Sequence, residues 1–132
     1  ERPERTEARV VAATHRDLEK LVAAGKFRED LYYRLRVVEI RLPPLRERMG
    51  DVPLLAEHLL RKAAETTGGR SLHLGPETAE CLMSHDWPGN VRELENTLTR
   101  AAVLATGDVI RPEHIETDAT PDTGPPRLIS LE

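Results

Sequence analysis

Residues 86–96 read DWPGNVRELEN, and this stretch predicts where a helix begins in the second half of the chain. Pro88 and Gly89 interrupt whatever structure precedes them. Asn90 is a residue type that favours the N-cap, where its side chain accepts an orphan backbone N–H. Glu93 stands three residues later, the position from which a carboxylate reaches back to close a capping box. The sequence therefore predicts a helix that starts directly after Asn90.

Arg92 is unexpected in the first turn of this predicted helix. The positive end of a helix dipole favours an anion, so a cation there needs a reason. An arginine beside free backbone N–H groups is well placed when an anion occupies the site, and phosphate is the commonest such ligand. This helix start is therefore a candidate phosphate site with Arg92 as its cation.

Composition limits the class of protein. The chain has 132 residues, of which 39% are apolar and only 3% aromatic, so its core depends on Leu, Val, Ile and Ala. It has no run of eighteen apolar residues, as a membrane span requires, and its first residues lack the basic-then-apolar order of a signal peptide. One cysteine, Cys81, excludes an internal disulfide and fits a reducing compartment. We expect a cytoplasmic protein with no membrane contact.

Charge is divided unevenly along the chain. Residues 1–50 hold twelve Lys and Arg against nine Asp and Glu, whereas residues 51–132 hold seven against fourteen. Duplex DNA requires a basic surface on its partner. The second half is therefore not expected to bind DNA.

Residues 1–49 are predicted to form part of an α/β domain. An apolar run at 8–14 and alternating apolar residues at 36–42 predict two strands. Helical spacing predicts a helix that Gly25 ends and a second helix over 27–35. The order β-α-α-β is typical of an α/β sheet.

Residues 50–116 are predicted to form a small helical unit. Helices are expected from Asp51 to about Glu65, from Pro76 to about His85, and from Asn90 to near Gly107. Residues 117–132 are rich in Thr, Pro, Asp and Gly, a composition that predicts a flexible linker.

Several candidate sites have two interpretations. Arg28 and Arg34 either project toward the phosphate of a neighbouring molecule, or Asp30 pairs with Arg34 while Arg28 is solvated. Thr14 and His15 lie at the end of the strand predicted at 8–14. Strand ends are where α/β sheets place ligand-contacting groups, but a polar residue there is also common in an ordinary turn.

Cys81 and His85 are spaced four residues apart but supply only two of the four ligands that a metal site needs. We interpret them as a buried thiol near a surface histidine and expect no metal.

The segments VVAATHRDLEKLVAAGKFREDLYYRLRVVEIRLPPLRERMGDVPLLAEHLL (10–60) and WPGNVRELEN (87–96) strongly resemble the sigma-54-dependent transcription activators, the bacterial enhancer-binding AAA+ ATPases. The resemblance covers about residues 8–116. It implies an α/β fold, with the C-terminal part of an AAA+ P-loop-type α/β subdomain at 1–49. A small all-helical lid subdomain at 50–116 and a flexible linker at 117–132, leading toward an absent DNA-binding domain, would follow.

The resemblance also implies roles for the candidate residues. AATHRDL is similar to sensor I, which implies that Thr14 and His15 lie near the nucleotide γ-phosphate; the family more often carries Asn in place of His15. FREDLYYRL is similar to the arginine-finger segment, which implies that Arg28 and Arg34 reach the ATP site of the neighbouring subunit. WPGNVREL resembles sensor II, which implies that Arg92 contacts the bound nucleotide.

The implied cofactor of the intact protein is Mg-ATP. The implied partners are neighbouring AAA+ subunits in a ring and the sigma-54 RNA polymerase. The family's phosphate loop, magnesium-binding acidic strand end and GAFTGA loop lie upstream of sensor I, and its helix-turn-helix, the only DNA contact expected, follows the linker. None of these motifs occurs in the 132 residues.

We therefore expect this chain alone to bind ATP weakly or not at all and to be inactive as an ATPase. The alternative is a non-catalytic interaction module or remnant that joins or inhibits rings of intact activators.

Overall fold

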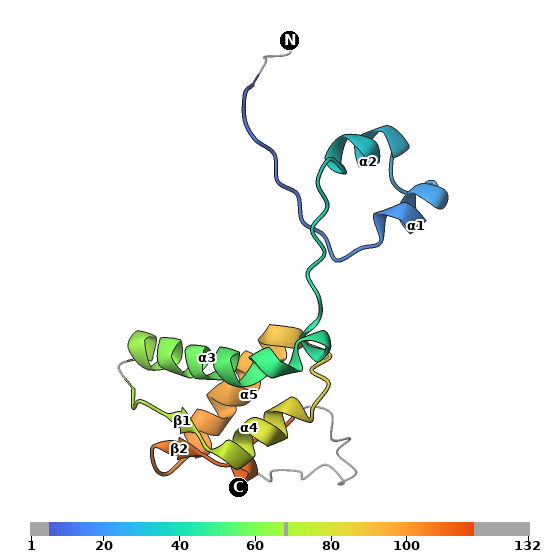
Figure 1. The fold of residues 1–132 in the computed structure, drawn as a ribbon. Helices are drawn as coiled ribbons and strands as arrows, with labels where there is room; N and C mark the ends of the chain where they lie inside the picture. The colour runs from blue at the N-terminus through green and yellow to red at the C-terminus, as the bar shows by residue number, and fades with distance from the viewer. Residues whose placement is uncertain (1–5, 68, 118–132) are drawn as a thin grey trace, which may run out of the picture. The chain divides into compact units, whose positions relative to one another are not determined.

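The computed structural model describes residues 6–67 and 69–117, which Figure 1 draws in colour. These residues belong to two compact units. The first unit comprises the described residues up to Leu42, and the second begins at Pro43. Beyond Thr117, the predicted linker lies outside the described residues.

The first unit contains two short helices, α1 (Leu18–Ala23) and α2 (Glu29–Leu35). Asp17 caps α1 by accepting a hydrogen bond from the backbone N–H of Lys20 at 3.1 Å. Gly25 has a φ of 70°, the left-handed conformation that glycine adopts without steric cost. The prediction that Gly25 ends this helix is confirmed.

The strands predicted at 8–14 and 36–42 are wrong. Both segments lie outside any helix or strand, and their apolar side chains are exposed, 86% for Val11 and 84% for Leu42. A strand needs a neighbour to bond its N–H and C=O groups, and within the described residues neither segment has one. An apolar run predicts burial only when a partner covers it.

The second unit is mainly helical, as predicted. Its long helices are α3 (Val52–Thr67), α4 (Pro76–Met83) and α5 (Asn90–Leu104). Three single-turn 3₁₀ helices accompany them: η1 (Leu45–Glu47), η2 (Met49–Asp51) and η3 (Pro112–His114). Two short strands, β1 (His73–Leu74) and β2 (Val109–Ile110), pair in parallel. Helix α3 packs against both α4 and α5 (Figure 1).

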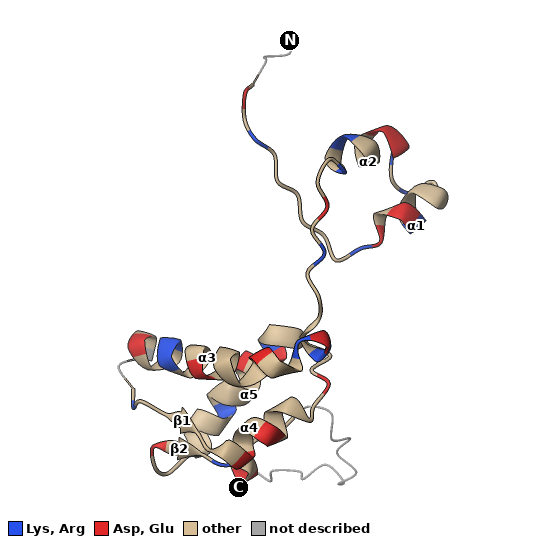
Figure 2. Ribbon diagram, viewed as in Figure 1, with Lys and Arg blue, Asp and Glu red and all other residues tan. Residues whose placement is uncertain are grey.

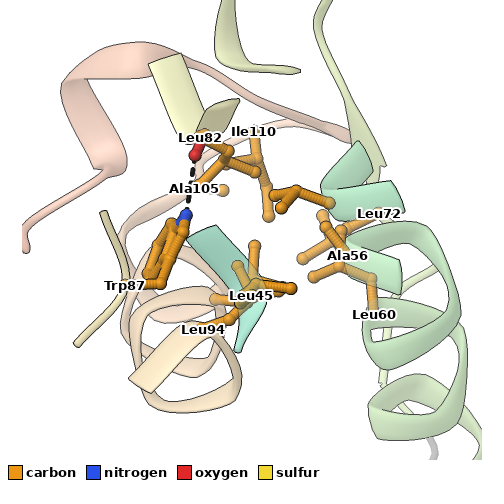
Figure 3. Packing of buried hydrophobic residues seen from close by; sticks show 12 residues of the cluster. Leu45, Ala56, Leu60, Leu72, Leu82, Trp87, Leu94, Ala105 and Ile110 are labelled. Atoms are coloured by element: carbon orange, nitrogen blue, oxygen red, sulfur yellow. Dashed lines mark hydrogen bonds between the residues drawn. The ribbon is translucent and has the colours of Figure 1, made fainter. Parts of the chain in front are cut away.

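One hydrophobic core holds the second unit together. Val52, Ala56 and Leu60 recur at four-residue spacing on α3 and are almost fully buried. Leu94 and Leu98 face them from α5. Figure 3 shows Ala56 and Leu60 of α3 on one side of the core and Leu94 of α5 on the other. The other members of the cluster come from the connecting segments and the neighbouring elements: Leu45, Leu72, Leu82, Trp87, Ala101, Ala105 and Ile110.

The charged residues of α3 lie outside this core. Along α3, acidic and basic residues are interspersed (Figure 2), as Glu57, Arg61, Lys62 and Glu65 are in the sequence. This mixture does not provide the continuous basic surface that DNA requires.

Candidate functional site

Thr14 and His15 lie in the turn that leads into α1. Both are exposed, and the Thr14 Oγ1 accepts a hydrogen bond from the backbone N–H of Arg16 at 3.1 Å. The N-cap Asp17 follows immediately. Thr14 is therefore held in a side-chain-to-backbone turn at the start of the helix.

Arg28 immediately precedes α2 and donates two hydrogen bonds to the carboxylate of Asp30. Its Nε lies 3.0 Å from Oδ1 and its Nη2 lies 2.6 Å from Oδ2, while its side chain stays 79% exposed. This bidentate pair lowers the pKa of the Asp30 carboxyl, and the more distant charge of Arg34 adds a smaller lowering. The predicted Asp30–Arg34 ion pair is wrong, because the nearer guanidinium takes the carboxylate.

Arg34 lies in the last turn of α2 and is exposed. It forms no ion pair or hydrogen bond with any residue in 6–67 or 69–117. Its guanidinium is thus available to a ligand or to another chain.

A polar network joins α1 to α2. The Tyr32 hydroxyl donates a hydrogen bond to the Glu19 carboxylate at 2.9 Å, and the Arg36 Nη1 lies 2.9 Å from the same carboxylate oxygen. Arg36 also pairs with Glu39 at 2.9 Å. Burial and the bond to Glu19 raise the pKa of Tyr32, and the neighbouring Tyr32 and Glu39 raise the pKa of Arg36. Only the four-residue spacing of Tyr32 and Arg36 hinted at this network in the sequence.

Trp87 anchors the turn between α4 and α5. Its indole is fully buried, and its Nε1 donates a hydrogen bond to the carbonyl of Leu82 at 2.7 Å, drawn as the dashed line in Figure 3. The ring of His85 packs edge to face against the indole, with 4.6 Å between the two ring centroids. Trp87 has a φ of 51°, an uncommon conformation for a large side chain, which burial and this hydrogen bond keep in place.

Glu93 supplies the cap at the start of α5. Its Oε2 accepts the backbone N–H of Gly89 at 2.7 Å, and its Oε1 lies 2.8 Å from the His85 Nε2. Both side chains are largely buried, at 7% and 15% exposed. A side chain at Gly89 would place its Cβ 2.7 Å from the Glu93 Cβ, so this close approach requires glycine. The prediction that Glu93 reaches back is confirmed, but its target is Gly89.

Asn90 does not cap α5, so that prediction is wrong. It is the first residue of the helix and has a φ of 50°, which asparagine tolerates better than most residues. Its Oδ1 accepts the backbone N–H of Leu45 at 2.8 Å. Asn90 therefore satisfies the orphan donor at the start of η1, 45 residues away in the sequence.

Arg92 is exposed in the first turn of α5 and has no ion pair or hydrogen bond among the described residues. The Glu93 carboxylate also lies at this helix start, where it binds the Gly89 N–H and the His85 ring. The phosphate predicted beside Arg92 stays a prediction. The two units separate the candidates: Arg92 belongs to the second, whereas Thr14, His15, Arg28 and Arg34 belong to the first.

Other classes of site find no support in the part of the chain that the structure describes. His85 is engaged by Glu93, and no group of three His, Cys, Asp or Glu side chains in 6–67 and 69–117 is arranged to hold a metal ion. None of the helices in those ranges is long and apolar enough to cross a membrane.

Comparison with known proteins gives two family matches and many relatives. The AAA+ ATPase lid domain family matches residues 46–126, and the Sigma-54 interaction domain family matches residues 1–41. The transcriptional regulatory protein ZraR of Salmonella typhimurium is 53% identical over 104 residues, which are 79% of this chain and 24% of ZraR. The Nif-specific regulatory protein of Azotobacter vinelandii is 51% identical over 127 residues, 96% of this chain and 24% of that protein. The chain thus spans about a quarter of the length of these relatives.

Solved structures agree with these matches. The crystal structure of NtrX from Brucella abortus in complex with ATP is similar with a TM-score of 0.72 and 34% identity, over 88% of this chain and 28% of that one. The complex with ADP has a TM-score of 0.70 and 36% identity over 78% of this chain and 24% of that one. The predicted fold class is confirmed.

Proposed function

Since the chain belongs to the sigma-54-dependent transcription activators, as a C-terminal part of their AAA+ domain, we propose that it supplies arginines and nucleotide sensors to an ATP-driven regulator of RNA polymerase. Its domains are then the end of the α/β subdomain at 1–49, the lid at 50–116 and a linker from 117. The single cysteine and the transcription regulators among its relatives support a place in the cytoplasm.

The proposal rests on the exposure and the pairing of the three candidate arginines. Arg34 and Arg92 are exposed and unpaired among the described residues, and Arg28 is committed only to the exposed carboxylate of Asp30. A guanidinium that donates two parallel hydrogen bonds to a carboxylate can bind a phosphate with the same geometry. These side chains therefore fit a ligand that carries phosphate groups.

The related NtrX binds ATP. In the intact protein, ATP bound together with Mg²⁺ would supply the phosphoryl group. Arg28 and Arg34 act from one subunit on the site of its neighbour in a ring, where they donate hydrogen bonds to the phosphoryl oxygens and offset their charge. Thr14, His15 and Arg92 contact the nucleotide of their own subunit. The intact protein acts on sigma-54 RNA polymerase and reaches DNA through a helix-turn-helix, while this chain alone binds ATP weakly or not at all.

The test is a chimera in which the matched region of Brucella NtrX is replaced by this chain. ATP binding and hydrolysis are measured against NtrX itself. Arg28→Ala and Arg34→Ala are expected to lower the hydrolysis rate by about a thousandfold, the effect typical of a lost arginine finger, with ATP affinity nearly unchanged. Arg92→Ala is expected to weaken ATP binding.

Two controls make this result specific. Arg61→Ala removes an exposed arginine of α3 and should change neither quantity. Mixing an Arg28→Ala chimera with subunits that have a defective phosphate loop should restore hydrolysis in part, because an intact arginine then meets an intact phosphate site. Absence of any rate loss in Arg28→Ala and Arg34→Ala would sink the arginine-finger assignment.

The alternative function is a non-catalytic module that joins or inhibits rings of intact activators. Exposed apolar residues of the first unit favour it: Val11, Val37 and Ile40 are 86%, 82% and 79% exposed. Adding the chain to intact NtrX separates the two functions. Inhibition of NtrX hydrolysis supports the module, and an unchanged rate contradicts it.

A further inference from the structure

Asn90, the first residue of α5, makes a long-range contact that the sequence did not predict. Its Oδ1 accepts the N–H of Leu45, the first residue of η1, at 2.8 Å. Leu45 is itself only 5% exposed and belongs to the hydrophobic core. It stands three residues after Leu42, where the first unit ends. The hydrogen bond therefore ties the start of α5 to the point where the chain enters the second unit.

The side chain of Asn90 explains why glycine does not occupy this position. A φ of 50° is adopted most readily by glycine, so asparagine gains nothing in backbone freedom. What asparagine adds is an acceptor for a backbone N–H that has no partner within η1. Without that acceptor, the partly buried donor would lose its hydrogen bond.

Glu93 holds the same turn from its other end. Its carboxylate bridges the Gly89 N–H and the His85 ring in a largely buried setting. The backbone of Glu93 also donates to the Gly89 carbonyl at 3.2 Å. Both ends of the turn 90–93 are thus anchored by buried or partly buried contacts.

Arg92 lies between these two anchors, and its own side chain is exposed and unpaired among the described residues. We infer that Asn90 and Glu93 are positioning residues, which hold the backbone of Arg92 so that its guanidinium meets a phosphate-bearing ligand with little ordering cost. This inference rests on the role proposed above for Arg92. Preorganisation of this kind improves affinity because less conformational freedom is lost on binding.

The test uses the full 132-residue chain labelled with ¹⁵N. Asn90→Gly keeps the backbone conformation but removes the acceptor, whereas Asn90→Asp keeps an acceptor for the Leu45 N–H. In Asn90→Gly, amide hydrogen exchange at Leu45 and Glu93 should accelerate about tenfold, as expected for one lost hydrogen bond. The backbone order parameter of Arg92 should fall from about 0.85 toward 0.6. Asn90→Asp should restore both values.

Ile110→Val is the matched control, because it weakens the same core away from the α5 start. It should leave the Arg92 order parameter unchanged. If Asn90→Gly also leaves that order parameter and the Glu93 exchange rate unchanged, or if its effects equal those of Ile110→Val, the positioning role is wrong. These readouts decide the matter whether or not the chain binds ATP.

ATP titration of the NtrX chimera, with and without Asn90→Gly or Arg92→Ala, separates this inference from the proposed function, because the chain alone is expected to bind ATP weakly or not at all. Shifts at the Arg92 Nε that are smaller in Asn90→Gly support both. The nucleotide-sensor role of Arg92 is contradicted if ATP causes no chemical-shift change at the Arg92 Nε. It is also contradicted if the changes at the start of α5 persist in Arg92→Ala. Shifts that are the same size in Asn90→Gly contradict the positioning role alone.

Discussion

At the scale of single residues, burial and close contact decide which side chains can be changed. Thr97 is fully buried, and its Oγ1 has no hydrogen-bond partner among the described residues. Gly89 lies so close to Glu93 that any side chain would collide with it. Arg28 and Asp30 form an ion pair that depends on neither burial nor the core.

Thr97→Val is expected to raise the free energy of unfolding by about 1 kcal/mol, because the similar shape fills the same space without an unpaired hydroxyl. Urea unfolding measures the change. Thr99→Val is the control, since the Thr99 Oγ1 is exposed and bonds to the Glu95 carbonyl at 2.8 Å, and it should bring no gain. A loss of stability in Thr97→Val would mean that the hydroxyl does have a partner.

Gly89→Ala is expected to lower the free energy of unfolding by about 2 kcal/mol, the usual range for an overpacked site. The new Cβ would lie 2.7 Å from the Glu93 Cβ and 3.2 Å from its Oε2, so the cap must move. Gly107→Ala is the matched control, because apart from Gly107 and its chain neighbours no described residue has an atom within 4 Å of the added Cβ. Equal stability of the two variants in thermal unfolding would contradict the close approach.

Arg28→Gln is expected to raise the pKa of Asp30 toward its ordinary value of 3.8, since the pair with Arg28 is the main cause of its lowering. A carboxyl whose pKa is lower in the folded state stabilises the fold above its unfolded pKa. That contribution disappears as the pH falls through the folded pKa. Carboxyl ¹³C NMR titration follows the change directly.

Arg34→Gln is the companion variant for this titration. It should move the pKa of Asp30 much less, because Arg34 acts only through space. A larger shift in Arg34→Gln than in Arg28→Gln would show that Asp30 changes its partner in solution.

At the scale of elements, the first unit and the second are stabilised differently. Among the described residues before Pro43, Tyr32 is the one buried side chain. It joins α2 to Glu19 on α1, and Arg36 completes the link. The helices of the second unit instead share a core made mainly of leucines and alanines.

Tyr32→Phe is expected to accelerate amide exchange over residues 18–35, because it removes the hydrogen bond between the two helices while most of the packing remains. Residues of the second unit should not respond. Tyr33→Phe provides the comparison, since Tyr33 is 63% exposed and forms no such bond among the described residues. Similar exchange in both variants would show that the hydroxyl of Tyr32 does not join the helices.

At the scale of the whole molecule, the apolar core lies almost entirely after residue 43. Twelve buried hydrophobic residues form one cluster there, and Tyr32 is the one buried hydrophobic residue described before it. We predict that hydrogen exchange of the isolated chain protects the helices of the second unit by orders of magnitude more than residues 6–42. Comparable protection of the two units would contradict this expectation.

The amino-acid sequence by itself determined the features that depend on neighbouring residues. The end of α1 before Gly25, the start of α4 at Pro76 and the backward reach of Glu93 were all predicted, because capping and turn signals act within a few positions. The family was also identified, since long segments in the same order are specific. The roles predicted for Thr14, His15, Arg28, Arg34 and Arg92 remain predictions.

Only the tertiary structure decided which distant groups meet. Asn90 was predicted to cap its own helix. Its Oδ1 instead accepts a hydrogen bond from the partly buried backbone N–H of Leu45, which belongs to another segment. Trp87 was not predicted as a core residue but is fully buried, whereas Val10 and Val11, in an apolar run predicted as a strand, are exposed. Burial and strand pairing depend on which partner the folded chain brings alongside, and no pattern within a few residues specifies that partner.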